Sequence, residues 1–191
     1  MTLEIQKRCE WVNLKNNLYI SYHDQEWGVP VFDDKKLFEM LILEGAQAGL
    51  SWEIVLNKRE NYRKAFDGFD YVKIAAYDDK KEKELLQNTG IIRNRLKIKS
   101  AIKNARVFLE IQEEFESFNK YIWAYVSFKP IKSSFKSIHE LPSKTELSDK
   151  ISKDLIKRGM SFVGSTIIYS FIQSVGLVND HIITCFRYKE C

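Results

Sequence analysis

Hydrophobic residues recur every three or four positions along most of this chain, which is the spacing of one face of an α-helix. One such run, directly behind Asp33 and Asp34, consists of Leu37, Phe38, Leu41 and Ile42. The two aspartates can cap a helix start, because a carboxylate accepts hydrogen bonds from the free amides of the first turn. The pattern therefore predicts a helix here that buries its hydrophobic face.

The same spacing predicts further helices, which cover residues 51–66, 70–76, 79–87, 94–111, 121–126, 147–157 and 165–175. Ser51 can cap the first of these, and Gly159 can end the helix over 147–157. No run alternates as a half-buried strand does, and the three prolines fall between helices. Residues 127–144 are the loosest stretch and a candidate connection between lobes. The sequence thus predicts an all-α protein, residues 1–191 forming a single unit of two closely packed helical lobes.

Composition adds little to this picture but excludes several classes of protein. Hydrophobic residues make up 45% of the 191 residues and charged residues 29%, which is ordinary for a globular protein. No hydrophobic run approaches the roughly 18 residues of a membrane span, and the first residues lack the hydrophobic stretch of a secretory signal. Three cysteines do not suggest a disulfide framework. We therefore expect a cytoplasmic monomer with no membrane partner.

The segment Leu43–Trp52 is the most informative part of the chain. It reads Leu-Glu-Gly-Ala-Gln-Ala-Gly-Leu-Ser-Trp, so a carboxylate, two glycines, a leucine and an indole ring follow a hydrophobic helix. The carboxylate of Glu44 beside the ring of Trp52 suits a flat, electron-poor ring that donates hydrogen bonds. Leu50, preceded by Gly49, suits a wedge pushed between stacked bases. Taken alone, such a glutamate is usually a surface residue and such a tryptophan a core residue. The combination favours a pocket for a damaged base.

A second informative segment is the glycine turn before the helix predicted over 94–111. Its basic residues are Arg93, Arg95, Lys97, Lys99, Lys103 and Arg106, and no acidic residue occurs from position 90 to 107. A charge run of this kind is often only a solvated helix face. Together with Gly90 it is typical of a helix-hairpin-helix element, near residues 79–111, that binds DNA phosphates through free backbone amides.

The candidate phosphate contacts in this element are Gly90, Ile92, Arg93 and Lys97. Truncating Arg93 or Lys97 should weaken binding to every DNA sequence and flatten its dependence on salt concentration.

Two cysteines and two histidines near the chain ends form a candidate metal site: Cys9, His23, His181 and Cys185. His181 and Cys185 are four positions apart and would share one face if their segment were helical. A set of two thiolates and two imidazoles is typical of a closed structural zinc site. The spacing between Cys9 and His23 is not that of a zinc finger, so buried free thiols and core histidines remain the alternative.

Several segments, in this order along the chain, resemble the bacterial DNA-3-methyladenine glycosylase I family of helix-hairpin-helix glycosylases. They are residues 8–11, 19–30, 36–40, 43–52, 90–93, 158–159, 162–164 and 176–181. The resemblance runs from Cys9 to Cys185. Position 46 departs from it, because Ala46 stands where glutamine is expected, and we leave Ala46 out of the site.

The resemblance implies a helix-hairpin-helix glycosylase fold in which one structural zinc ion joins the N- and C-terminal segments. It places the zinc ligands on the four residues of the candidate metal site. It implies that Glu44, Tyr22 and Trp52 form the base pocket with Tyr19 beside it, and that Gly49 and Leu50 meet the gap in the duplex.

The implied activity is the excision of N3-methylated adenine from alkylated double-stranded DNA, with 3-methyladenine and an abasic site as products. Glycosylases of this superfamily usually place an aspartate about a helix length beyond the hairpin, but none occurs between Asp79 and Asp149. Methylation already gives the base a positive charge, so it departs neutral and needs little acid assistance. Glu44 would then attract the cationic ring and accept a hydrogen bond from its exocyclic amine. No motif places a lysine for strand cleavage.

Two rival functions remain open at the level of sequence. A non-catalytic, metal-clasped module that binds DNA or methylated base would share every feature except turnover. A metal-dependent hydrolase acting on a small purine would need an open position on the metal ion. Release of base from alkylated duplex DNA separates the first rival from a glycosylase.

Overall fold

The computed structural model describes residues 6–191. The α-helices over those residues are α1 (Asn17–Gln25), α2 (Asp34–Gln47), α3 (Trp52–Ala65), α4 (Tyr71–Ala75), α5 (Asp79–Gln87), α6 (Arg95–Phe115), α7 (Phe118–Ala124), α8 (Glu146–Lys157) and α9 (Ser165–Ser174). The remaining elements are the strands β1 (Ile131–Lys132) and β2 (Val178–Asn179) and the 3₁₀ helices η1 (Asp67–Phe69), η2 (Ile138–Glu140) and η3 (Phe186–Lys189). The predicted all-α class is confirmed.

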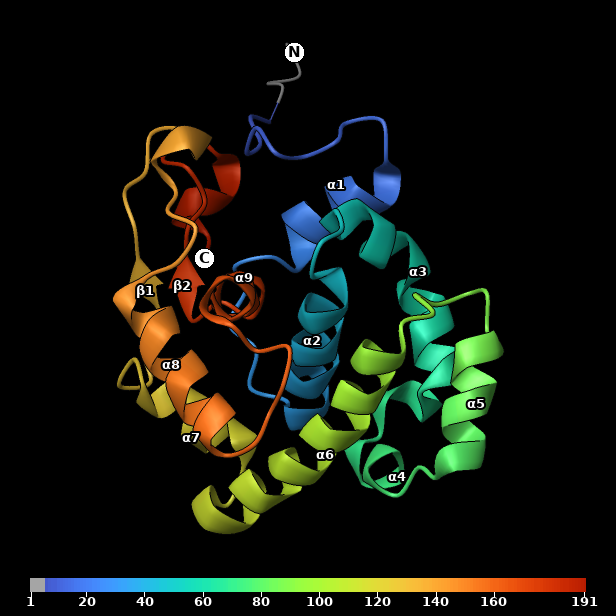
Figure 1. The fold of residues 1–191 in the computed structure, drawn as a ribbon. Helices are drawn as coiled ribbons and strands as arrows, with labels where there is room; N and C mark the ends of the chain where they lie inside the picture. The colour runs from blue at the N-terminus through green and yellow to red at the C-terminus, as the bar shows by residue number, and fades with distance from the viewer. Residues whose placement is uncertain (1–5) are drawn as a thin grey trace.

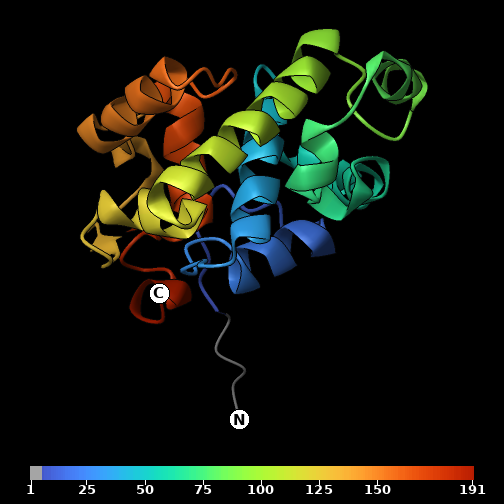
Figure 2. The ribbon, with the colours of Figure 1, turned by 90° about the horizontal axis from the view of Figure 1, so that it is seen from below.

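Helix α2 lies at the centre of the molecule (Figure 1). Every residue from Leu37 to Ala46 is buried, because α2 contacts α3 and α6 on one side and α7 and α9 on the other. Helix α6 crosses the molecule and contacts α4, α5, α2 and α7 (Figure 2). A helix buried on every side needs a sequence that is hydrophobic almost all round. The carboxylates that α2 nevertheless buries, Glu39 and Glu44, therefore require partners or a function.

Local signals predicted the start of α2 and the end of α8, whereas α1 was not predicted and α6 extends beyond its predicted end at residue 111. Asp33 caps α2, where its side chain accepts a hydrogen bond from the Lys36 amide at 2.8 Å. Gly159 follows α8 in the left-handed region, with φ of +107°. Ser51 stands before α3 as predicted, but its side chain makes no capping hydrogen bond. The Ser51 hydroxyl therefore does not cap the start of α3.

The stretch predicted to be loose, residues 127–144, contains β1 and η2 and is otherwise irregular. Strand β1 pairs in parallel with β2, with Ile131 opposite Val178 and Lys132 opposite Asn179. Strands of two residues are too short to produce a detectable alternation, so the sequence did not reveal them. The pairing attaches this stretch to the segment that leads to His181 and the C-terminus.

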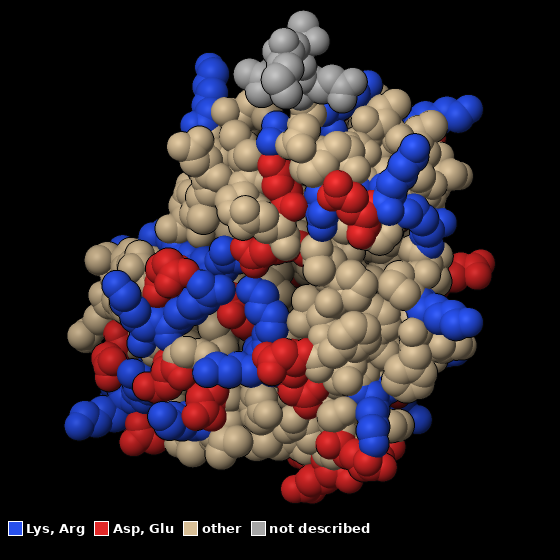
Figure 3. All heavy atoms as spheres, turned by 180° about the vertical axis from the view of Figure 1, so that it is seen from behind, with Lys and Arg blue, Asp and Glu red and all other residues tan. Residues whose placement is uncertain are grey.

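Charges of both signs lie side by side on the face opposite to that of Figure 1 (Figure 3). Many charged side chains of residues 6–191 form ion pairs. Arg59 of α3 contacts Glu26 beyond α1, and Arg63 of α3 contacts Glu39 of α2. Lys36 contacts both of these carboxylates. This network ties α1, α2 and α3 together. Within residues 6–191, no helix has the length and hydrophobicity needed to cross a membrane.

Candidate active site and metal centre

A cavity of about 240 Å³ opens beside the C-terminal end of α2. Its lining residues are Trp11, Tyr19, Tyr22, Trp27, Glu44, Gln47, Trp52, Ile138, Leu141, Ser170 and Gln173. Aromatic rings dominate this lining, and a few polar groups converge on the same space. Such a composition is typical of a site for a small, flat ligand. The structure thus brings Glu44, Tyr19, Tyr22 and Trp52 around one cavity.

Glu44 is the only carboxylate that lines this cavity among the described residues. Its side chain comes from the last turns of α2 and is 3% exposed. Burial raises the pKa of Glu44 to about 8, an effect that the Ser174 hydroxyl partly offsets. The Oε2 atom is buried without a hydrogen-bond partner in residues 6–191. Burial therefore favours the neutral form of this carboxyl group, whose hydrogen bonding is incomplete among the described residues.

The aromatic wall beside Glu44 combines residues from α1 and α3. The rings of Tyr22 and Trp52 have centroids 5.2 Å apart and planes inclined by 44°. Burial raises the pKa of Tyr22 well above its usual range, so its hydroxyl stays protonated. The indole Nε1 of Trp52 is buried and has no acceptor in the described part of the chain. An unpartnered donor and an unpartnered acceptor in one cavity each cost about 1–3 kcal/mol, which a bound ligand can recover.

Sequence reasoning did not identify several of the lining residues. Trp11 packs against Tyr19, with ring centroids 5.4 Å apart, and against Trp27 at 5.0 Å. Trp11 belongs to the segment 8–11 that carried the resemblance, so a signal for it existed. Gln173 of α9 had no such signal. Its Nε2 donates to the buried Asp180 at 2.8 Å, a contact that only the tertiary structure creates.

The turn after α2 carries an exposed leucine, Leu50. We call residues 48–51 the wedge turn. Gly49 has φ of +77° and no neighbour within 4 Å of where a Cβ would lie, and Leu50 is 38% exposed. A second cavity, of about 230 Å³, lies against this turn and shares Glu44, Gln47 and Ser170 with the first. The exposed leucine and the cavity lined by Glu44 are therefore adjacent.

Three groups in and beside the hairpin between α5 and α6 form hydrogen bonds within the protein. The Gly90 amide donates to Asn88 Oδ1 at 2.8 Å, and the Ile92 amide donates to the Tyr62 hydroxyl at 3.2 Å. Lys97 Nζ donates to two carbonyl oxygens of the main chain near the end of α2. These three groups, expected to be free for phosphate, are engaged inside the protein. Arg93, by contrast, is exposed.

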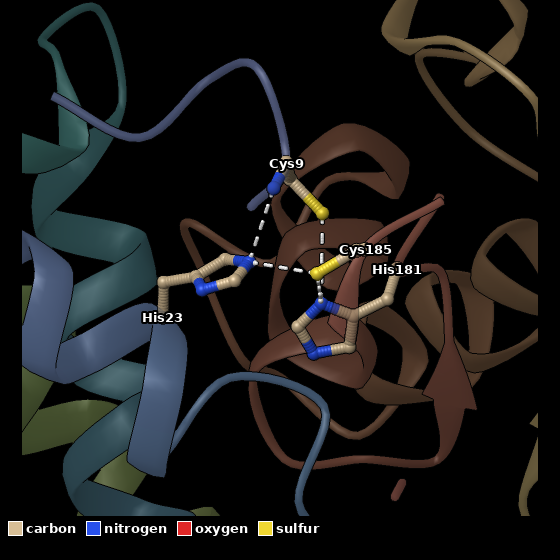
Figure 4. A group of neighbouring side chains, drawn as sticks. All are labelled: Cys9, His23, His181 and Cys185. Carbon is tan, nitrogen blue, oxygen red and sulfur yellow. Dashed lines mark hydrogen bonds between the residues drawn. The ribbon is translucent and has the colours of Figure 1, made fainter. Parts of the chain in front are cut away.

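The four candidate metal ligands form one buried cluster (Figure 4). Their donor atoms all lie within 4.8 Å of one another. Cys9 Sγ lies 3.5 Å from His181 Nδ1, and Cys185 Sγ lies 3.4 Å from His23 Nε2 and 3.5 Å from His181 Nδ1. A tetrahedral ion with bonds of about 2.0–2.3 Å separates its ligand atoms by roughly 3.5 Å. The cluster therefore has the dimensions of a tetrahedral metal site.

Partners of the two imidazole rings support the same interpretation. The remaining nitrogen of His23, Nδ1, lies 2.7 Å from an Asp24 oxygen, and Arg8 holds Asp24 in turn. The remaining nitrogen of His181, Nε2, lies 3.0 Å from the Trp27 carbonyl. Rings that bind a metal ion through one nitrogen commonly donate from the other in this way.

The thiols of the cluster are unequal. Hydrogen bonding from Cys9, and then from His181 and His23, lowers the pKa of Cys185, while the same contact raises the pKa of Cys9. A lowered thiol pKa favours metal binding, because the thiolate is the form that binds the ion. His181 and Cys185 lie in a turn, not in a helix that would place them on one face. The Cys185 amide closes this turn by donating to the Ile182 carbonyl at 2.8 Å.

Comparison with known proteins places these features in a family context. Residues 11–188 match the methyladenine glycosylase family. The chain is 51% identical to DNA-3-methyladenine glycosylase 1 of Escherichia coli (strain K12) over 95% of this chain and 97% of that protein. A crystal structure of a 3-methyladenine DNA glycosylase I superposes with a TM-score of 0.91 at 53% identity, covering 94% of this chain and 98% of that one. A variant of 3-methyladenine DNA glycosylase I, solved in complex with 3-methyladenine, superposes with a TM-score of 0.88 at 32% identity, covering 90% and 92%.

Proposed function

The chain belongs to the methyladenine glycosylase family, and we propose that it excises N3-methylated adenine from alkylated double-stranded DNA. In this reaction water replaces the base at the sugar carbon, and 3-methyladenine leaves an abasic site behind. The observation that carries the proposal is the aromatic cavity in which Glu44 Oε2 and Trp52 Nε1 are both buried without a hydrogen-bond partner among residues 6–191. Residues 1–191 would act as a single catalytic unit.

Glu44 is the group that we propose to select the base. When ionised, its carboxylate accepts a hydrogen bond from the exocyclic amine of adenine and attracts the positive charge that methylation puts on the ring. Guanine presents a carbonyl oxygen at the same edge, so acceptor would face acceptor and binding would fail. The ring of Trp52 can stack on the cation, which contributes about 0.5–2 kcal/mol. Tyr22, fully buried beside it, can donate a hydrogen bond from its hydroxyl.

The chemistry requires little acid assistance. The bond between the sugar and the methylated base breaks with its electron pair going to the base, which thereby becomes neutral. The incoming water loses a proton to solvent as it bonds to the sugar. What the residues supply is orientation of the extruded base and an electrostatic field that favours the cation. A reaction that needs orientation and electrostatic attraction, but little acid assistance, agrees with a cavity in which Glu44 is the sole carboxylate among the described residues.

Extrusion of the base is the step that we assign to the wedge turn and the hairpin. Leu50, exposed on the wedge turn, would fill the space that the base leaves in the stack. Unstacking costs a few kcal/mol, and contacts to the DNA backbone must offset it. The exposed basic side chains near the start of α6, Arg93 and Arg95, are suited to those contacts.

We propose that the ion held by the four-residue cluster is a single structural zinc. Two thiolates and two imidazoles are the ligands that zinc prefers, and four protein ligands leave no open position for a substrate. The cluster joins Cys9 and His23 near one end of the chain to His181 and Cys185 near the other. Its role would be to hold these segments together.

The deciding experiment measures the bases released from methylated duplex DNA by chromatography, alongside elemental analysis of the protein. The wild-type protein should release 3-methyladenine. Glu44→Ala should lose this release while its fold and metal content persist, and Glu60→Ala, which removes an exposed carboxylate outside the cavity, should behave as wild type. Binding of methylated DNA without release of base would establish the rival, a non-catalytic binding module, and near-normal release by Glu44→Ala would remove Glu44 from the mechanism.

A further inference from the structure

We propose that Lys97 is a positioning residue, which fixes the wedge turn to the start of helix α6 and so couples DNA binding at the hairpin to extrusion of the base. The inference rests on the proposed function of the wedge turn. Its physical basis is a pair of hydrogen bonds. Lys97 Nζ donates to the Ala46 carbonyl at 2.8 Å and to the Ala48 carbonyl at 2.7 Å.

These carbonyls belong to the end of α2, where the last turn of a helix leaves acceptors without helical partners. The chain satisfies two of them itself, because the Ala48 amide donates to Gly45 and the Leu50 amide donates to Gln47. Lys97 donates hydrogen bonds to the carbonyls of Ala46 and Ala48. Its positive charge also lies at the negative end of the α2 dipole, where a cation is stabilised.

The direction of the Lys97 side chain sets it apart from its neighbours. Arg93, Arg95 and Leu96 are exposed around the start of α6, whereas Lys97 is half-buried. Desolvation lowers the pKa of Lys97, as expected for an amine that has left the solvent to contact α2. The Lys97 amide, in turn, donates to the capping Asn94 side chain at 3.1 Å. Lys97 thus forms a capping hydrogen bond at the start of α6 through its main chain. Through its side chain it also satisfies carbonyl groups at the end of α2.

The position of this contact gives it a functional consequence. The end of α2 carries Glu44 and Gln47 into the cavity, and the wedge turn with Leu50 follows at once. Without the ammonium group, Ala48 of the wedge turn would lose its hydrogen bond to α6, and the turn would sample more conformations. The wedge turn would then have to be ordered each time DNA binds, and this cost would oppose extrusion of the base. The rate of base release should therefore fall on duplex DNA, where the base must be unstacked. It should fall much less on single-stranded DNA, where the base is not held in a duplex.

The test compares Lys97→Met with Lys99→Met, a control that also removes one positive charge from α6 but at an exposed position. For Lys97→Met we expect single-turnover release of 3-methyladenine from duplex DNA to fall by between about tenfold and a hundredfold. Release from single-stranded methylated DNA should change little. Lys97→Arg, whose guanidinium can also donate to two carbonyls, should restore most of the duplex activity. An unchanged ratio of duplex to single-stranded activity in Lys97→Met would overturn the proposal.

Two further measurements separate this inference from its rivals. If Lys97 contacts phosphate instead, Lys97→Met should lower the slope of log affinity against log salt by about 0.9, whereas positioning leaves that slope unchanged. Hydrogen exchange of the Ala48 and Leu50 amides should be faster in Lys97→Met than in wild type or Lys99→Met. This readout requires no catalysis, so it tests the contact even if the wild-type protein releases no base. Unchanged exchange would refute the link between Lys97 and the wedge turn.

Discussion

Glu44 is costly to the folded protein as long as the cavity is empty. Its carboxyl group lies in a buried setting with a pKa of about 8, and one of its oxygens lacks a partner among residues 6–191. A group of this kind lowers stability and is retained where it serves a function. For a ligand with a positive charge and an amine donor, the same burial becomes an advantage, because attraction is stronger where water is excluded.

The cost of Glu44 should appear in the pH dependence of stability. Since its pKa rises from 4.5 to about 8 on folding, the folded chain holds a proton that the unfolded chain loses, and stability falls with rising pH across that window. Glu44→Gln cannot titrate. Its free energy of unfolding relative to wild type should therefore increase from about pH 4.5, level off above about pH 8, and reach a few kcal/mol, on the order of 1.4 per pH unit.

Urea denaturation of both proteins at a series of pH values measures this difference, with Glu60→Gln as the exposed control on α3. A difference between Glu44→Gln and wild type that stays constant from pH 4 to 9 would contradict a raised pKa for Glu44.

At the scale of elements, the end of α9 is joined to the segment between α1 and α2. The Gly28 amide donates to the Gln173 carbonyl at 3.1 Å, and the Val31 amide donates to the Val175 carbonyl at 3.0 Å. Gly176 allows this approach. A Cβ there would lie 2.4 Å from the Val29 carbonyl carbon, and the residue has φ of +73°. The packing of α9 next to α2, which builds one wall of the cavity, therefore depends on a missing side chain.

Gly176→Ala should consequently destabilise the protein by about 2–5 kcal/mol, because the unfavourable φ and the overlap with the main chain add together. Gly49→Ala is the matched control. It has a similar φ of +77° but open space around it, so only the conformational cost of about 1–2 kcal/mol applies. Equal losses for the two variants in thermal or urea denaturation would show that the contact of Gly176 with Val29 is not limiting.

At the scale of the whole molecule, the metal cluster joins parts of the chain that are far apart in sequence. Cys9 and Cys185 are separated by most of the chain, yet each lies about 3.5 Å from His181 Nδ1. A bound ion would hold the N-terminal segment, the turn after β2 and α1 together, and its binding energy would add to the free energy of unfolding. The N-terminal segment carries Trp11 to the cavity, and α1 carries Tyr19 there.

Removal of the metal should therefore lower stability and loosen the aromatic wall. We expect Cys185→Ser to lose its bound ion and several kcal/mol of stability, as seen by elemental analysis and by thermal denaturation. Cys191→Ser is the control, because Cys191 lies outside the cluster and is also a free cysteine. Full metal content and an unchanged melting temperature in Cys185→Ser would exclude the site.

Helix positions and ends could be predicted because they depend on residues close together in sequence. Hydrophobic spacing placed α2, α3 and α6, Asp33 marked the start of α2, and Gly159 marked the end of α8 as predicted. The sequence also supplied the chemical composition of the metal cluster and of the cavity around Glu44. Such features can be recognised without knowledge of the fold, because periodicity and residue type are properties of the sequence alone.

Contacts between distant segments were decided only by the tertiary structure. The sequence could identify Lys97 as a basic residue beside a hairpin, but not that its amine would meet the carbonyls at the end of α2 rather than the solvent. It could not anticipate that a turn instead of a helix brings His181 and Cys185 together, or that Gln173 reaches the cavity. The reason is physical: where a long side chain ends, and which buried groups lack partners, depends on how separate helices pack, which no local pattern encodes.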